Sequence, residues 1–482
     1  MGDKILKIIV IFFTSVFFAY FCLTGNPSLP ITIFIFLLAL FLFIKRPYYF
    51  ILFYLLASLD FLGYINPLTF FYLPGYFKFK DIVFVFGILM IFKMVLIDKY
   101  KIHFSKDSPI KIFVFILLLL VTINWIRTFY MYSIEFKSIF QYSRRYLYYS
   151  SFLFPLYFIR NTNDLKSFFK ILFSICVIYS FLIIIQFFIG YDFNVLGNTV
   201  IAKQFLGGLE INRIYIKGLL LLCGVFTASI GYYLSCDKKN KYFFLGIFLI
   251  GCGIFLHFSR MFWFFILLTL LLWLIDIHKQ YKKIFIIIFS SICVVIFLGL
   301  IYSNIELPRN NYIKNIINFS ATSFSDVLHY KGTFKFRMEE SWFRFTLIEK
   351  HPLFGAGFIH PTHLPSIITL SRQERPDIAT VDSGWIALLT DFGIVGALWL
   401  ILFLISLIRY ERNFQKLSFD NSFKHNELKK VSKGVLYFLL LGVIISITHG
   451  FFTYEGNTPV IAISIGILER IHSLVIKNEN SN

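Results

Sequence analysis

The sequence predicts an all-α polytopic membrane protein with about 12–14 transmembrane helices and one large extracytoplasmic loop. Three observations support this fold class. Of the 482 residues, 58% are hydrophobic, and the mean hydropathy is +0.75. Only 15% are charged, against roughly 25% in an ordinary soluble domain. Apolar runs of membrane-crossing length alternate with short basic segments, a pattern typical of multi-pass membrane proteins.

The apolar runs define fourteen candidate spans in order along the chain. A helix needs about 20 apolar residues to cross a bilayer, so 145–159 is short. Twelve spans remain if 145–159 and 47–65 are re-entrant or interfacial. Three regions follow: membrane helices 1–11 in 1–303, a large loop in 304–381, and helices 12–14 in 382–482. The candidate spans are roughly 5–23, 29–45, 47–65, 80–97, 109–127, 145–159, 166–190, 214–235, 241–257, 260–276, 283–303, 382–408, 433–450 and 457–476.

Basic residues predict the orientation of these spans. With fourteen spans, the side that holds both termini carries 26 of the 46 lysines and arginines. The other side carries 19, nine of them in the long loop, and Lys93 lies within a span. Because cytoplasmic loops are enriched in Lys and Arg, we expect both termini in the cytoplasm and 304–381 outside. These charges lie between apolar runs, where they meet anionic lipid headgroups, so nucleic acid is not an expected partner.

The arginines are distributed differently from the lysines. Ten of the fifteen fall on the predicted outer side. Topology requires only positive charge, whereas Arg is the better planar, bidentate partner for phosphate and carboxylate. The outer arginines therefore favour anion binding, with headgroup contacts and ion pairs as the alternative. They are Arg127, Arg144, Arg145, Arg213, Arg260, Arg309, Arg337, Arg344, Arg372 and Arg375.

The long loop carries its own periodicity. Residues 334–350 predict a helix on the outer membrane face, because an apolar stripe lies beside an arginine stripe that includes Arg337 and Arg344. The alternative is a surface helix with solvated arginines. His351-Pro352 should end the helix, and Gly355 and Gly357 then allow a tight, closely packed turn.

The end of the loop holds the candidates for acid–base chemistry. His360 and His363 lie in its most polar part, and a histidine near a carboxylate can act as a general base. Pro361 and Pro365 argue against a helix there, so we predict no metal site. Asp382-Ser383 resembles a helix N-cap that opens the next span, and Asp382 is either a cap or a catalytic carboxylate. Gly393 and Gly396 should then interrupt that span.

Three of these segments together resemble the O-antigen ligase/polymerase superfamily over roughly 200–410. They are the Ser259-Arg260 start of a span, the loop end His351-Pro352-Leu353-Phe354-Gly355-Ala356-Gly357, and the following helix from Asp382-Ser383-Gly384-Trp385 through Asp391-Phe392-Gly393-Ile394-Val395-Gly396.

The resemblance implies transfer of a glycan from an undecaprenyl-diphosphate carrier, without metal or other cofactor. It implies that Arg213 and Arg260 hold the diphosphate, and Arg337 and Arg344 are further candidates. Related ligases typically place a catalytic His at the start of the post-loop helix, where this chain has Asp382-Ser383. That difference favours a polymerase and leaves Asp382, His360 and His363 as alternative bases.

We therefore expect a polymerase of lipid-linked oligosaccharide repeat units, of O-antigen or capsular type, in the inner membrane. Its expected partners are the lipid-linked oligosaccharide, membrane lipids and a chain-length regulator protein. The alternatives are a surface-glycan ligase of the same superfamily and a lipid-linked oligosaccharide flippase. Flippases usually have short loops, and no internal duplication is evident, so the long loop favours an enzyme.

Overall fold

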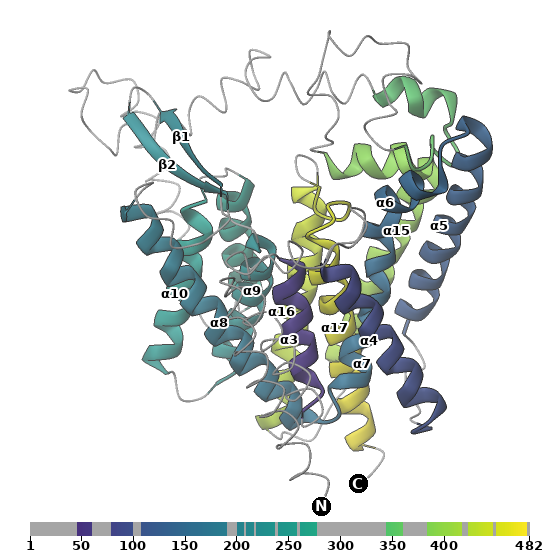
Figure 1. The fold of residues 1–482 in the computed structure, drawn as a ribbon. Coiled ribbons are helices and arrows are strands. Elements are labelled where there is room, and N and C mark those ends of the chain that lie inside the picture. The colour runs from purple at the N-terminus through teal and green to yellow at the C-terminus, as the bar shows by residue number, and fades with distance from the viewer. Residues whose placement is uncertain are drawn as a thin grey trace, which may run out of the picture.

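The chain forms a bundle of mainly antiparallel helices in the computed structural model (Figure 1). The structure describes residues 46–59, 79–99, 108–189, 200–206, 209–215, 218–236, 240–257, 261–276, 344–359, 383–416, 423–446 and 450–479. The predicted spans 5–23, 29–45 and 283–303 lie outside the described residues, as does most of the loop 304–381.

Apolar composition and few internal breaks make most of the described segments helical. The labelled helices are α3 Tyr48–Ser58, α4 Phe79–Leu96, α5 Ile110–Tyr132, α6 Phe136–Leu147, η2 Tyr148–Phe152, α7 Leu153–Phe158, α8 Thr162–Ile189, α9 Leu219–Ser235, α10 Lys241–Phe255, α15 Gly384–Lys416, α16 Phe423–Ile445 and α17 Thr458–Glu479. A further helix spans Met261–Asp276, and residues 344–350 form a short helix that we call the loop helix.

Among the described residues, four segments are helical, long and apolar enough to cross a membrane: Ile110–Tyr132, Thr162–Ile189, Gly384–Lys416 and Thr458–Val475. Four shorter apolar helices accompany them. Many large apolar side chains of α5, α8 and α15 are exposed, as expected for helices that face lipid. The prediction of an all-α polytopic membrane protein is confirmed, apart from one β-hairpin.

The doubtful span 145–159 belongs to a longer helical run. The 12 residues of α6, 5 of η2 and 6 of α7 follow one another without a gap from Phe136 to Phe158, which gives 23 residues. That length is enough to cross a bilayer. The sequence underestimated it because the first three turns carry polar side chains, of which Ser143, Arg144 and Arg145 find partners inside the protein.

A two-stranded hairpin was not predicted. β1 Val200–Leu206 pairs antiparallel with β2 Leu209–Tyr215, and Ala202 lies opposite Arg213. The hairpin lies mainly in the segment between the predicted spans 166–190 and 214–235. The next helix therefore begins later than predicted. Helix α9 begins at Leu219, after Gly218 in the left-handed conformation (φ +88°), whereas the expected start was 214.

The bundle places α16 against α9, and α17 against α3, η2 and α7, while α5 packs on α6 and α15. Glycines allow the closest approaches: a Cβ at Gly466 of α17 would lie 2.2 Å from the Phe152 carbonyl oxygen of η2. Small residues at such contacts are typical of helices packed within membranes. We call the end of the bundle that holds α6, the loop helix and the start of α15 the α6 end (Figure 1).

Candidate functional site

The α6 end contains a candidate site built from α5, α6, the loop helix and α15. Of the catalytic and diphosphate-binding residues expected from sequence, Arg344 lies in this site as the first described residue of the loop helix. Arg127 and Arg145, which were predicted only as outer arginines, lie here too. Arg213 lies in β2, whose backbone alone is described. Arg260, Arg337, His360, His363 and Asp382 lie outside the described residues.

The glycine segment that follows the loop helix docks into a kink of α15. The loop helix ends at Lys350, as predicted from His351-Pro352. Gly393 interrupts α15 with φ +64° and ψ −155°, a conformation that is essentially restricted to glycine. The predicted interruption is thus confirmed at Gly393, whereas helical structure continues through Gly396.

Backbone hydrogen bonds join the kink to the segment 352–356. The amides of Ile394 and Val395 donate to the carbonyls of Pro352 and Leu353 at 2.8 and 3.1 Å. In return, the amide of Ala356 donates to the carbonyl of Thr390 at 2.7 Å. The kink therefore leaves these backbone groups paired within the protein, which membrane-embedded backbone requires.

Two glycines allow this docking, as the sequence indicated. Gly355 (φ +70°) and Gly357 (φ +89°) both adopt left-handed conformations. A Cβ at Gly355 would lie 2.5 Å from the Thr390 carbonyl oxygen, and one at Gly357 would lie 2.2 Å from Thr128 Oγ1. Any larger residue would push the segment away from α15 or α5.

Arg127 of α5 fixes the other flank of the glycine segment. Its guanidinium donates to the carbonyls of Phe354 and Gly355 at 2.9 and 3.2 Å and lies over the Phe354 ring. The neighbouring Thr128 Oγ1 accepts a hydrogen bond from the Phe358 amide at 2.9 Å. The expected anion-binding role is therefore not needed to explain Arg127, which holds backbone carbonyls.

A buried ion pair lies two residues before the kink. Asp391 of α15 is 1% exposed. Its Oδ2 accepts from Arg145 Nη2 and from the Tyr146 hydroxyl, both at 2.5 Å. The Arg145 guanidinium also lies over the rings of Tyr142 and Tyr146, with the nearer centroid 4.1 Å away. Residues of α6 thus hold the carboxylate in place from two sides.

Arg344 brings a second buried guanidinium to this region. Its side chain is 1% exposed, so the alternative of a solvated surface arginine does not hold here. Its charge acts electrostatically on both Asp391 and Tyr142. Among the described residues, none accepts a hydrogen bond from its Nε or Nη2. The Nε of Arg145 likewise has no acceptor within the described part of the chain.

Open donors of this kind have a chemical consequence. A buried guanidinium is strongly disfavoured unless a negative or polar partner receives its hydrogen bonds. Among the described residues, this cluster holds two arginines and one aspartate, a formal excess of one positive charge. The arrangement is therefore suited to an anionic ligand, and a guanidinium matches phosphate oxygens in geometry as well as charge.

His351, at the end of the loop helix, is a titratable group that sequence reasoning did not select. Its ring meets the Tyr132 ring edge-on, with centroids 6.4 Å apart. Burial, followed by the charges of Arg127 and Lys350, holds the pKa of His351 below its ordinary value of 6.5. The imidazole is therefore neutral near pH 7, and this form can accept a proton.

The comparison with known families concerns the segment that carries much of this site. Residues 245–403 match the sequence model of a protein family described as O-antigen ligase. No curated protein matches the chain. The matched residues include Arg344, the docked glycine segment, Asp391 and the Gly393 kink, whereas Arg145 lies outside them. This match confirms the predicted resemblance to the O-antigen ligase/polymerase superfamily, whose members are enzymes that act on lipid-linked glycans.

Proposed function

We propose that the protein polymerises undecaprenyl-diphosphate-linked oligosaccharide repeat units on the outer face of the cytoplasmic membrane. The observation that carries the proposal is the buried Arg344, whose Nε and Nη2 have no acceptor among the described residues. It stands beside the Arg145–Asp391 pair and within the segment that matches the O-antigen ligase family. Its ligand is the diphosphate of the lipid carrier.

The transfer chemistry fits this assignment. The hydroxyl of an acceptor sugar attacks the anomeric carbon of the donor, and the bond from that carbon to the diphosphate oxygen breaks. Negative charge develops on the leaving diphosphate, and guanidinium donors directed at that charge stabilise the transition state. The hydroxyl proton passes to a base. Arg344 supplies the first donors, and Arg213, Arg260 and Arg337 remain proposed partners for the same diphosphate.

The identity of the base stays a proposal. Asp382, His360 and His363 were selected from sequence, and none lies in the described residues. His351 joins them because its lowered pKa keeps the imidazole mainly in the neutral, proton-accepting form at pH 7. A polymerase is favoured over a ligase by Asp382-Ser383, since related ligases have a histidine at the start of that helix.

The outward orientation of the α6 end is part of the proposal. It is supported by the excess of basic residues on the predicted cytoplasmic side, such as those of the connection 409–433. In a cysteine-free background, a cysteine at position 325 should react with a membrane-impermeant reagent in intact spheroplasts. A cysteine at 422 should react only after permeabilisation. The opposite pattern would reverse the orientation and remove the site from the compartment of the acceptor.

A gel of the surface glycan from a strain without this gene tests the activity. A polymerase predicts that the ladder disappears while a single repeat unit is retained. Loss of every repeat unit would contradict polymerisation and indicate a ligase or a flippase.

Complementation tests Arg344 within the same experiment. The wild-type gene should restore the ladder, whereas Arg344→Ala and Arg344→Lys should not, because an ammonium lacks the planar fork that grips a diphosphate. Loss of one such donor costs about 10²–10³ in rate. Glu349→Gln is the matched control, since Glu349 lies exposed on the same helix. A normal ladder from Arg344→Lys at wild-type protein level would remove Arg344 from the diphosphate site.

A further inference from the structure

Two consecutive arginines of α6 contact different neighbouring elements. Successive residues of an α-helix are about 100° apart around its axis. Arg145 extends to Asp391 of α15, as described above. Arg144 extends to α4 and to the turn that precedes α17. Ion pairs therefore connect α6 to its neighbours on two sides.

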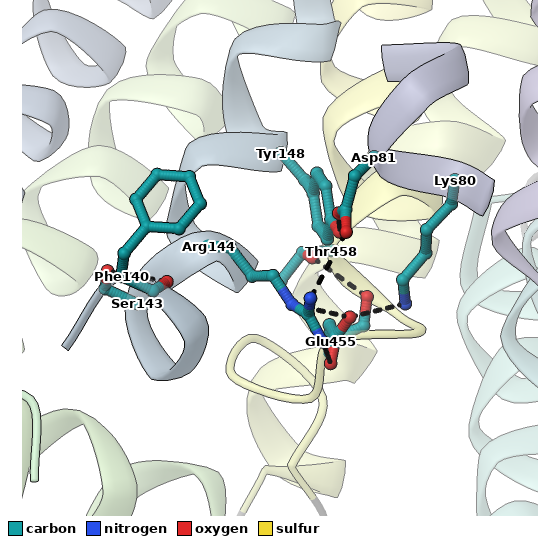
Figure 2. A network of polar contacts seen from close by, with 8 residues as sticks. All are labelled: Lys80, Asp81, Phe140, Ser143, Arg144, Tyr148, Glu455 and Thr458. Carbon is teal, nitrogen blue, oxygen red and sulfur yellow. Dashed lines mark hydrogen bonds and ion pairs between the residues drawn. The ribbon is translucent and has the colours of Figure 1, made fainter. Parts of the chain in front are cut away.

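On the Arg144 flank, five residues form a polar network (Figure 2). Arg144 Nη1 lies 3.2 Å from Asp81 Oδ2, and Arg144 Nε lies 3.1 Å from Glu455 Oε1. Lys80 Nζ lies 2.9 Å from the same Glu455 oxygen, and the Tyr148 hydroxyl donates to Asp81. The network joins α4, α6, η2 and the turn before α17, with two acidic and two basic side chains.

Because this network is buried, its ion pairs contribute little net free energy to the stability of the fold. The side chain of Arg144 is 6% exposed and that of Lys80 is 8% exposed. Taking ion pairs out of water costs about as much as their attraction returns, and apolar residues of similar size often serve stability as well or better. What a charged network adds is a defined geometry, because each side chain must keep its partners.

Polar contacts are prominent among those that fix the rotation of helix α6. Its buried residues are Ile139, Ser143, Arg144 and Tyr146, of which one is aliphatic. The remaining contacts are aromatic and polar. The Tyr146 ring packs on Phe358 and Phe392, Ser143 Oγ accepts from Trp125 Nε1 at 2.5 Å, and Tyr146 donates to Asp391. Aromatic rings can pack at several rotations of a helix, whereas ion pairs and hydrogen bonds require one, so the polar side chains define the rotation of α6 most narrowly.

We propose that Asp81, Arg144 and Glu455 are positioning residues, which set the rotation of α6 and so hold Arg145 against Asp391 beside Arg344. The inference rests on the proposed function of that site, and it deepens it by assigning a second layer of residues to the transfer reaction. These residues act through Arg145 and touch no substrate. Lys80 and Tyr148 complete the partners of the two carboxylates.

The test is transfer kinetics of the full-length protein in liposomes with a lipid-linked oligosaccharide, using Arg144→Gln, Arg144→Lys and Asp81→Asn. Each should lower kcat by about 10²-fold, since small misplacements of catalytic groups have that effect. KM for the donor should change little, because the lost interaction acts in the transition state. Lys should not rescue, since one ammonium cannot replace the fork that joins Asp81 to Glu455. The exposed Lys137→Gln, on the same helix, is the control and should keep wild-type kcat.

A double-mutant cycle separates positioning from a general structural role. If Arg144 acts through Arg145, then Arg144→Gln should cost little in a protein that already carries Arg145→Gln. Independent effects that multiply would overturn the proposal. So would Arg144→Lys with wild-type kcat, or a loss confined to KM.

Hydrogen exchange gives a readout that does not need activity. Arg144→Gln should speed amide exchange in 136–147 and around Asp391, whereas Lys137→Gln should not. If the wild type transfers no glycan, the proposed function fails. Faster exchange in Arg144→Gln would then still support the role of Arg144 in positioning α6. If the wild type transfers glycan but exchange around Asp391 is unchanged in Arg144→Gln, the positioning role fails alone.

Discussion

The Gly393 kink allows a sharp test of how the loop docks on the membrane helices. We consider Gly393→Ala, which adds one methyl group. At φ +64° and ψ −155° an alanine is strained, by about 1–3 kcal/mol. The new Cβ would also lie 2.5 Å from the Gly355 nitrogen and from the Pro352 and Leu353 carbonyl oxygens. These are backbone atoms, which cannot move aside without undocking the segment.

Undocking breaks three backbone hydrogen bonds between the segment 352–356 and α15, each worth about 1 kcal/mol. Because undocking lets residue 393 relax, the strain is not added, and the expected loss is about 3 kcal/mol, a large share of the stability of a typical protein. The assay is the thermal midpoint of purified protein in mild detergent. Gly393→Ala should unfold at a much lower temperature than the wild type, or fail to accumulate.

The matched control is Gly224→Ala in α9. A Cβ there would lie 3.6 Å from the Phe438 ring, an ordinary contact, and its φ is not positive. The effect should stay within about 1 kcal/mol, with Ala favoured by helix propensity. Gly355→Ala should resemble Gly393→Ala, and the two should not add, since both undock the same segment. A Gly393→Ala protein as stable as the wild type would refute the docked geometry.

Four further outcomes are expected. Asp391→Ala should lower the yield of folded protein on size-exclusion chromatography, because it leaves Arg145 buried without its carboxylate, at a cost of about 3–5 kcal/mol. Arg127→Lys should lower the thermal midpoint, since one ammonium cannot reproduce two guanidinium bonds to backbone carbonyls. His351 has a lowered pKa, so its contribution to stability is present above pH 6.5 and is lost as the pH falls through the folded pKa; the thermal midpoint of His351→Gln should therefore fall less between pH 7.5 and 5 than that of the wild type. Asp382→Asn should abolish glycan transfer with normal folding if Asp382 is the base, and should remain active if it is a helix cap.

Hydropathy was sufficient for most of the fold because lipid exposure and backbone pairing leave few alternatives to a long apolar helix. Helices α5, α8 and α10 begin within four residues of the predicted starts. Hydropathy underestimates the run 136–158, since Arg144 and Arg145 count against a membrane span although both have partners inside the protein. Their carboxylate partners, Asp81 and Asp391, are distant in sequence, and periodicity cannot pair them.

Some features of the candidate site can likewise be predicted from the sequence, and others cannot. The loop end and the Gly393 interruption were readable because glycine and proline act locally on the backbone. Residue type identifies Arg344 as a candidate, whereas in the sequence Asp391 stands only within the motif that contains Gly393 and Gly396. An acidic residue inside an otherwise apolar span is itself a signal, because such residues usually face a partner or a site. The partner could not be identified from spacing, since it lies on α6.

The most direct test of the central claim is glycan transfer by the purified protein. The wild type, reconstituted in liposomes with undecaprenyl-diphosphate-linked repeat units and no divalent metal, should convert single repeats into lipid-linked chains of two or more. Arg344→Lys should be folded and should reconstitute into the same liposomes as well as the wild type, yet it should form at least about 10²-fold less product. Single repeats that remain unextended by the wild type, or equal chain formation by Arg344→Lys, would contradict the account.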